Sequence, residues 1–184
     1  MNITAGKFKG QKITAPDEKI TRPTLSKVRM SVFNTLQAIT DFDGKSFLDM
    51  YAGSGIMALE AVSRGFASAV AIEKHPKVAA VIKNNYKKYC DCDLKLLMGD
   101  SLKITQKFKE KFDVIYIDPP YFSGIYEQSL EAVKNIANGI IILEHVTDVE
   151  FGSYEIIKQK KYGDKIITFL KIKDNTENIC LTEN

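Results

Sequence analysis

The residues with the clearest chemical potential lie in one stretch, Asp49 to Gly55, which reads Asp-Met-Tyr-Ala-Gly-Ser-Gly. An apolar run precedes it, and a helical pattern begins directly after it. Gly53 and Gly55 can adopt positive φ, and without a Cβ they let a ligand lie against the backbone. The stretch therefore predicts the first strand–loop–helix of a nucleotide-binding α/β unit. Its candidate ligand-binding residues are Asp49, Tyr51, Ala52, Gly53, Ser54 and Gly55.

Two common glycine motifs do not match this loop. Ala58 stands where the dinucleotide fingerprint has its third glycine, and no Gly-Lys-Ser/Thr follows as a P-loop would require. The alternative for the stretch taken alone is a tight strand-to-helix turn that binds nothing.

Polar side chains follow three further apolar runs. Glu73 ends the run 68–73, where a carboxylate can bind the two hydroxyls of a ribose. Asp100 and Ser101 follow the run 94–98, and Asp118-Pro119-Pro120-Tyr121 follows the run 112–117. Because the carboxyl ends of parallel strands meet at one edge of a sheet, these groups predict a single crevice.

This order of motifs resembles the S-adenosylmethionine-dependent methyltransferases, and Asp-Pro-Pro-Tyr is the signature of those that methylate an exocyclic amine of a base. The resemblance implies S-adenosylmethionine as cofactor, with Glu73 on its ribose and Asp100 accepting from its adenine amino group. Asp49 either reaches the methionine ammonium or fixes the loop by accepting backbone amides. The cofactor-binding set also contains Tyr51, Ala52, Gly53, Ser54, Gly55, Lys74, Ser101 and Asp118.

Methyl transfer from a sulfonium needs positioning more than acid–base machinery. Asp118 can accept a hydrogen bond from an amino group, and the Pro119 carbonyl, directed by the rigid Pro119-Pro120 pair, can accept another. Tyr121 offers a ring on which a base can stack. The four residues Asp118, Pro119, Pro120 and Tyr121 are thus the predicted catalytic motif, whose alternative is a sharp turn after a strand.

Strand and helix patterns alternate from Phe47 onward and end in two alternating runs separated by Tyr162-Gly163-Asp164. This order predicts a Rossmann-like α/β fold of the class I methyltransferase type, with a seven-stranded, mostly parallel sheet and a C-terminal antiparallel hairpin. The domains expected are a basic hairpin and helix extension (1–40), a methyltransferase domain (41–173) and a disordered polar tail (174–184). The expected helices are 56–64, 76–86, 102–108 and 126–136, and the later strands 69–73, 94–98, 113–118, 139–144, 154–161 and 166–173.

The N-terminal segment is basic although the whole chain has a net charge of only +3. Residues 1–29 contain seven Lys or Arg against two acids, which indicates a polyanionic partner. Two short alternating runs in residues 3–14 predict a β-hairpin, and Thr24, after Arg22-Pro23, is a candidate cap for the next helix. A solvated hairpin with a structural cap is the alternative. The predicted RNA-binding residues are Lys7, Lys9, Arg22, Thr24, Lys27 and Arg29.

Composition excludes several other classes of protein. The three cysteines form no C-x-x-C pair and the two histidines have no zinc-ligand spacing, so no metal is expected. Apolar runs such as Ile140 to Leu143 are too short to span a bilayer, and no signal core is present. These features predict a soluble, cytoplasmic protein with no membrane contact, and a monomer is the expected state.

Further motifs make the resemblance narrower. Ile3 to Gly10, Arg22-Pro23-Thr24, Val28-Arg29, the glycine loop and Asp-Pro-Pro-Tyr together resemble the bacterial 16S ribosomal RNA guanine-N2 methyltransferases, the RsmD family. Ser26-Lys27 and Ser31 stand where the family usually has Asp-Arg and Glu. The family implies methyl transfer to N2 of a guanine in small-subunit rRNA, within the assembling 30S particle. The alternatives are an N6-adenine methyltransferase of DNA or RNA and a catalytically silent rRNA-binding assembly factor.

Overall fold

A mixed β-sheet organises the chain. The computed structural model describes residues 1–17, 20, 25–120 and 124–173, and within them the sheet has seven strands in the order β3-β2-β1-β4-β5-β7-β6. The first five strands are parallel, whereas β7 is antiparallel to both β5 and β6. The predicted fold class is confirmed. The strands are β1 (Ser46–Asp49), β2 (Ser68–Glu73), β3 (Asp93–Met98), β4 (Phe112–Ile117), β5 (Ala137–His145), β6 (Tyr154–Tyr162) and β7 (Lys165–Ile172).

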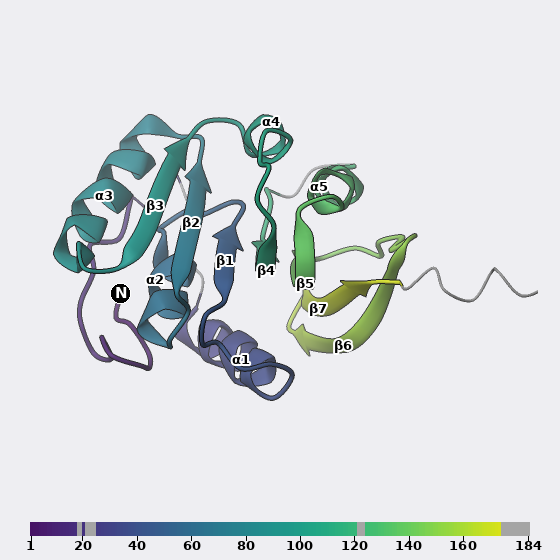
Figure 1. Ribbon diagram of the computed structural model, residues 1–184, viewed down its shortest axis with the longest axis horizontal. Helices are drawn as coiled ribbons and strands as arrows, with labels where there is room; N and C mark the ends of the chain where they lie inside the picture. The colour runs from purple at the N-terminus through teal and green to yellow at the C-terminus, as the bar shows by residue number, and fades with distance from the viewer. Residues whose placement is uncertain (18–19, 21–24, 121–123, 174–184) are drawn as a thin grey trace, which may run out of the picture.

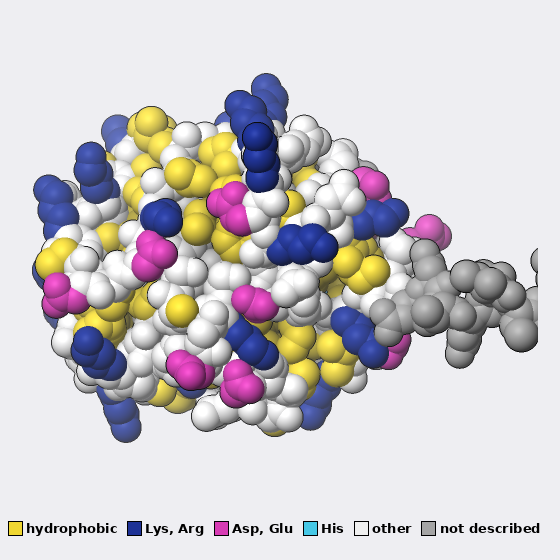
Figure 2. All heavy atoms as spheres, viewed as in Figure 1, with side chains coloured by type: hydrophobic (Ala, Val, Ile, Leu, Met, Phe, Trp, Pro, Cys, Tyr) yellow, Lys and Arg dark blue, Asp and Glu magenta, His cyan; other side chains and the backbone are white. Residues whose placement is uncertain are grey.

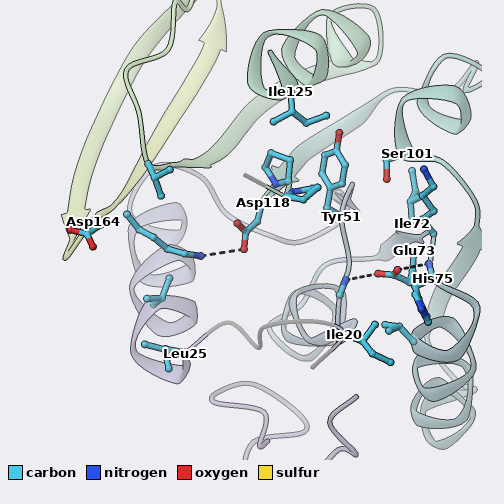
Figure 3. Close-up of a pocket in the computed structure, with 18 of the residues that line it drawn as sticks. Ile20, Leu25, Tyr51, Ile72, Glu73, His75, Ser101, Asp118, Ile125 and Asp164 are labelled. Atoms are coloured by element: carbon cyan, nitrogen blue, oxygen red, sulfur yellow. Dashed lines mark hydrogen bonds and ion pairs between the residues drawn. The ribbon is translucent and has the colours of Figure 1, made fainter. Parts of the chain in front are cut away.

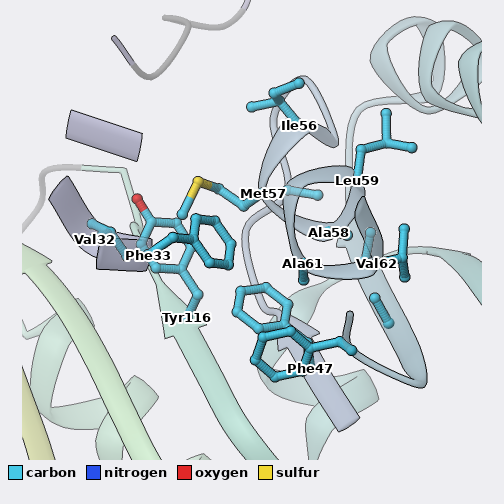
Figure 4. Packing of buried hydrophobic residues seen from close by; sticks show 14 of the residues in the cluster. Val32, Phe33, Phe47, Ile56, Met57, Ala58, Leu59, Ala61, Val62 and Tyr116 are labelled. Carbon is cyan, nitrogen blue, oxygen red and sulfur yellow. The ribbon is translucent and has the colours of Figure 1, made fainter. Parts of the chain in front are cut away.

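Helices cover both faces of this sheet (Figure 1). Successive residues of a strand point to opposite faces, so Phe47 packs in the cluster under α1, α2 and α3, whereas Leu48 packs in the cluster under α5. Figure 4 shows the first cluster, in which Phe33 of α1 lies between Tyr116 and the residues of α2. The helices are α1 (Ser26–Gln37), α2 (Ile56–Ser63), α3 (Pro76–Tyr86), the 3₁₀ turn η1 (Lys87–Tyr89), α4 (Ser101–Thr105) and α5 (Ile125–Val133).

Two helices are shorter than the sequence pattern predicts. The pattern predicts α4 to reach residue 108 and α5 to reach 136, but they end at Thr105 and Val133. Pairing with β4 begins already at Ala137, so β5 starts two residues before its predicted position. The chain must therefore turn over residues 134–136, and the amide of Ile136 bonds the Val133 carbonyl in this turn. Strand pairing overrides the apolar periodicity here.

The predicted N-terminal hairpin is reduced to one antiparallel bridge between Asn2 and Lys12. Backbone bonds such as that from the Ile3 amide to the Gln11 carbonyl join its two arms, and the segment also bonds to α2, where the Lys7 amide donates to the Ser63 carbonyl at 2.7 Å. Gly6 is required at this contact, because a Cβ there would lie 1.8 Å from that same carbonyl oxygen. Ile3 is buried in the cluster that also holds α1, so residues 1–17 share the core of the sheet domain.

The helix that follows the basic segment begins at Ser26, with Leu25 as its N-cap residue. Thr24, the predicted cap, lies outside the described residues, as do Arg22 and Tyr121. Within the described part of the chain, no helix is long and apolar enough to cross a bilayer.

Candidate active site

A cleft of about 1340 Å³ opens at the carboxyl ends of the parallel strands. It lies where the strand order reverses between β1 and β4, the position at which open α/β sheets bind ligands. Figure 3 shows Asp118 and Tyr51 toward the middle of the site, with Glu73 and His75 on one side and Asp164 of the C-terminal hairpin on the other. Of the predicted site residues, the lining includes Lys27, Tyr51, Gly53, Glu73, Lys74, Asp100, Ser101, Asp118, Pro119 and Pro120.

The glycine loop after β1 forms one wall through its backbone. Gly55 has φ +74°, and a Cβ there would lie 2.8 Å from Ile82 and 2.9 Å from the Tyr86 hydroxyl. The Tyr86 hydroxyl donates to the Gly55 carbonyl at 3.0 Å, which ties the loop to α3. Gly53 donates its amide to Glu73 at 3.0 Å. The loop is therefore held by fixed contacts on both sides, and glycine is required for its close packing.

Asp49 ends β1 and is only 1% exposed. Neither of its carboxylate oxygens has a hydrogen-bond partner of ordinary geometry among the described residues. Burial, with the negative charges of Asp118 and Glu73, raises the pKa of Asp49 well above its usual range, and the backbone amide of Tyr51 offsets this only in part. A buried carboxylate with so little hydrogen bonding is costly unless a ligand donates to it. Of the two roles expected for Asp49, this arrangement favours a bound ammonium over fixing the loop, so the residues present fit the methionine portion of S-adenosylmethionine.

The replacement Asp49→Asn is expected to stabilise the ligand-free protein while weakening cofactor binding. Because the folded-state pKa of Asp49 is raised, the folded protein binds the proton more tightly than the unfolded chain. Stability therefore falls as the pH rises from the unfolded value, about 3.9, through the raised folded value. The neutral asparagine removes this loss, so we expect a higher Tm at neutral pH. Affinity for S-adenosylhomocysteine should fall by about 10- to 100-fold in calorimetric titrations. A lower Tm in Asp49→Asn would show that the carboxylate supports the fold instead.

The ends of β2 and β3 carry the next two acids. Glu73 accepts amides from Gly53 at 3.0 Å and from His75 at 2.7 Å, which orients its carboxylate at the cleft. A carboxylate has about four acceptor positions, so further ones are available for the hydroxyls of a ribose. Asp100 caps α4 by accepting the Lys103 amide, which lowers the pKa of Asp100, and it pairs with Lys74 at 3.2 Å. Lys74 thus reaches the cleft as a partner of Asp100.

Asp118 directly follows β4 and lies at the centre of the site. Its carboxylate is 3.5 Å from the ammonium of Lys165, the first residue of β7, and the dashed line at Asp118 in Figure 3 marks this contact. Lys165 also pairs with the fully buried Glu144 at 2.6 Å. The sequence pattern predicts neither partner, because the apolar alternation of the C-terminal runs identifies strands but not which charged residues face the site. The adjacent Pro119 is buried in the cleft wall.

The predicted RNA-binding residues do not lie together in the structure. Lys27 on α1 is exposed and lines the cleft. Lys7 and Lys9 do not line it, because their segment is bonded to Ser63 at the C-terminal end of α2, away from the carboxyl ends of the strands. On the face shown in Figure 2, basic and acidic side chains are interspersed rather than gathered in one basic patch.

The prediction that Arg29 contacts RNA is wrong. Arg29 is 1% exposed, and its guanidinium lies 3.4 Å from the fully buried carboxylate of Glu60. It also donates to the Asn2 carbonyl at 2.8 Å. Its helix packs over α2, so the side chain connects the N-terminal segment to the core and is not available to a phosphate.

No group of three or more potential metal ligands is present among the residues that the structure describes.

Comparisons with known proteins agree with this geometry. The family profile described as "Conserved hypothetical protein 95" matches residues 1–171. YlbH of Bacillus subtilis is 31% identical over 179 residues, covering 89% of this chain and 94% of the relative. Ribosomal RNA small subunit methyltransferase D of Escherichia coli K12 is 28% identical over 150 residues, covering 82% and 74%. The solved structure of Escherichia coli yhhF superposes with a TM-score of 0.83 at 21% identity, covering 94% and 98%. With this fold, these motifs and these matches, the chain belongs to the RsmD-type family of Rossmann-like methyltransferases.

Proposed function

We propose that this protein transfers a methyl group from S-adenosylmethionine to the exocyclic N2 of a guanine in 16S rRNA. The observation that carries the proposal is Asp118-Pro119 at the switch point of the sheet, beside a cleft that also exposes Glu73 and Asp100. Relatives named ribosomal RNA small subunit methyltransferase D support rRNA as the substrate class.

The residues of the cleft divide into a cofactor side and an amine side. When bound, S-adenosylmethionine supplies an electrophilic methyl group on a sulfonium. Glu73 and Asp100, which line the cleft, would hold its ribose and its adenine amino group, and the buried Asp49, which does not line the cleft, would hold its ammonium. Tyr51, whose hydroxyl bonds Ser129 at 2.8 Å, contributes a fixed ring to the same wall.

On the amine side, Asp118 and the Pro119 carbonyl each accept one hydrogen of the NH₂ group. Two acceptors orient the nitrogen lone pair toward the methyl carbon, which is the main contribution that positioning can make. As the N–C bond forms and the sulfonium–methyl bond breaks to leave a neutral thioether, the nitrogen would gain positive charge, which the Asp118 carboxylate would stabilise, and Asp118 would then take the proton that the nitrogen loses. For Tyr121, which lies outside the described residues, we propose a stacking role under the base.

For RNA, we assign the first contact to Lys27, which lines the cleft. Lys7, Lys9, Arg22 and Thr24 are proposed as further contacts to ribosomal RNA or to an assembling 30S particle. Lys7 and Lys9 would touch RNA away from the cleft, so the substrate would have to extend over α2.

The test is to map methylated bases in small-subunit rRNA from cells with and without this protein, then to supply purified protein and labelled S-adenosylmethionine to RNA from the deficient cells. We expect one N2-methylguanine to disappear from the deficient cells and to be restored in vitro. Loss of an N6-methyladenine instead would favour the adenine alternative. Unchanged methylation together with RNA binding would favour a catalytically silent assembly factor.

A further inference from the structure

Lys165 connects the catalytic motif to a buried polar pair. Its ammonium lies 2.6 Å from Glu144 and 3.5 Å from Asp118. Glu144, near the end of β5, is fully buried, and its other oxygen accepts a hydrogen bond from the Tyr116 hydroxyl. The contacts therefore run from Tyr116 through Glu144 and Lys165 to Asp118, and join three strands of the sheet to the motif.

The negative charges around this series of contacts explain why the Lys165 ammonium lies next to Asp118. Asp118, Glu73 and Glu144 lie near Asp49 at the same ends of the strands, and the negative charge of each raises the pKa of Asp49 in addition to burial. Neighbouring carboxylates repel one another and favour protonation. The ammonium of Lys165 opposes this repulsion at Asp118. Burial and the charge of Glu144 raise the pKa of Tyr116 well above its usual range, so its hydroxyl remains a donor to Glu144.

The ammonium is itself anchored. A lysine ammonium stands on a flexible four-carbon stem, so it holds a fixed position only where it is hydrogen-bonded or ion-paired. The short contact to Glu144 supplies that bond, and Lys165 is only about a quarter exposed (25%). We infer that Lys165, held by Glu144, is a positioning residue that balances the negative charge of the Asp118 carboxylate and holds it turned toward the amine. This inference rests on the proposed function, in which Asp118 binds the reacting amino group.

The competing role for Lys165 is direct contact with an RNA phosphate. Such a contact would draw the ammonium away from two carboxylates, of which Glu144 is buried and would lose a charged partner. Removing one partner of a buried pair is strongly unfavourable. The geometry therefore favours action through Asp118, and the two roles differ in how Lys165 and Asp118 combine.

The test is a double-mutant cycle with Lys165→Met and Asp118→Asn, read as the single-turnover rate on the rRNA substrate. We expect Lys165→Met to lower the rate by roughly 10- to 100-fold in the wild-type background and by less than about threefold in the Asp118→Asn background. Affinity for S-adenosylhomocysteine should stay unchanged in Lys165→Met. The matched control is Lys161→Met, an exposed lysine of the same hairpin that also lines the cleft. Its effect should be the same in both backgrounds.

Equal losses in both backgrounds would overturn the inference, because a phosphate contact or a folding defect acts whether or not Asp118 is charged. Lys165→Gln provides a second variant that keeps a donor for Glu144 without the positive charge, and it should show the same dependence on Asp118. If wild-type protein transfers no methyl group to rRNA, the proposed function fails, and the cycle is read instead from urea unfolding of the ligand-free protein. Non-additive midpoints would then support the Lys165–Asp118 interaction, and additive midpoints would contradict it.

Discussion

Replacing Asp118 with alanine should lower the rate of methyl transfer by about 10²- to 10³-fold, equivalent to roughly 2.7–4 kcal/mol of transition-state stabilisation. The carboxylate accepts from the amino group before reaction and stabilises the positive charge that develops on nitrogen during it. Both contributions are lost together in Asp118→Ala. The measurement is a single-turnover assay with saturating protein and labelled S-adenosylmethionine, which separates the chemical step from product release.

Two further variants make this result specific. Asp118→Asn keeps an acceptor oxygen without the charge, so its rate should fall between wild type and Asp118→Ala. Asp43→Ala removes an exposed acid that does not line the cleft and should leave the rate unchanged. Affinity for S-adenosylhomocysteine in Asp118→Ala should stay within a few-fold of wild type. Near-normal turnover in Asp118→Ala would refute the amino-methyltransferase assignment.

The second large effect is on stability, and it compares two cations of α1. Arg29→Met should destabilise the protein by about 3 kcal/mol, because it leaves the buried Glu60 without one of its charged partners. This is the lower end of the range for a broken buried pair, since Arg64 still lies 3.2 Å from Glu60. For a chain of this length the Tm should fall by roughly 6–12 °C. Lys27→Met, an exposed position on the same helix, should change stability by less than about 0.5 kcal/mol.

RNA binding should show the opposite pattern for these two cations. If Lys27 contacts a phosphate, Lys27→Met reduces the slope of log affinity against log salt by about 0.7–0.9. Arg29→Met should leave this slope unchanged at a temperature where the variant remains folded. A flattened slope with an unaltered Tm in Arg29→Met would place the guanidinium on the RNA and contradict the burial of this side chain.

The sheet and one side of the site follow from local patterns in the sequence. Apolar runs, each followed at once by a glycine loop or an acid, are local patterns, and the carboxyl ends of parallel strands must lie at one edge. Glu73, Asp100 and Asp118 therefore reach the same cleft, as the order of motifs predicts.

Which charged residues are buried and which are available depends on contacts between distant parts of the chain. Lys27 and Arg29 are both basic and lie two residues apart in the sequence. Helical geometry turns Lys27 to the cleft and Arg29 toward Glu60, which is 31 residues away. The sequence pattern likewise predicts the C-terminal hairpin without its place in the sheet. Because β7 pairs with β5, Lys165 comes within reach of Asp118 across 47 residues of sequence. Local periodicity carries no information on pairs so far apart, since their contact depends on strand order and burial.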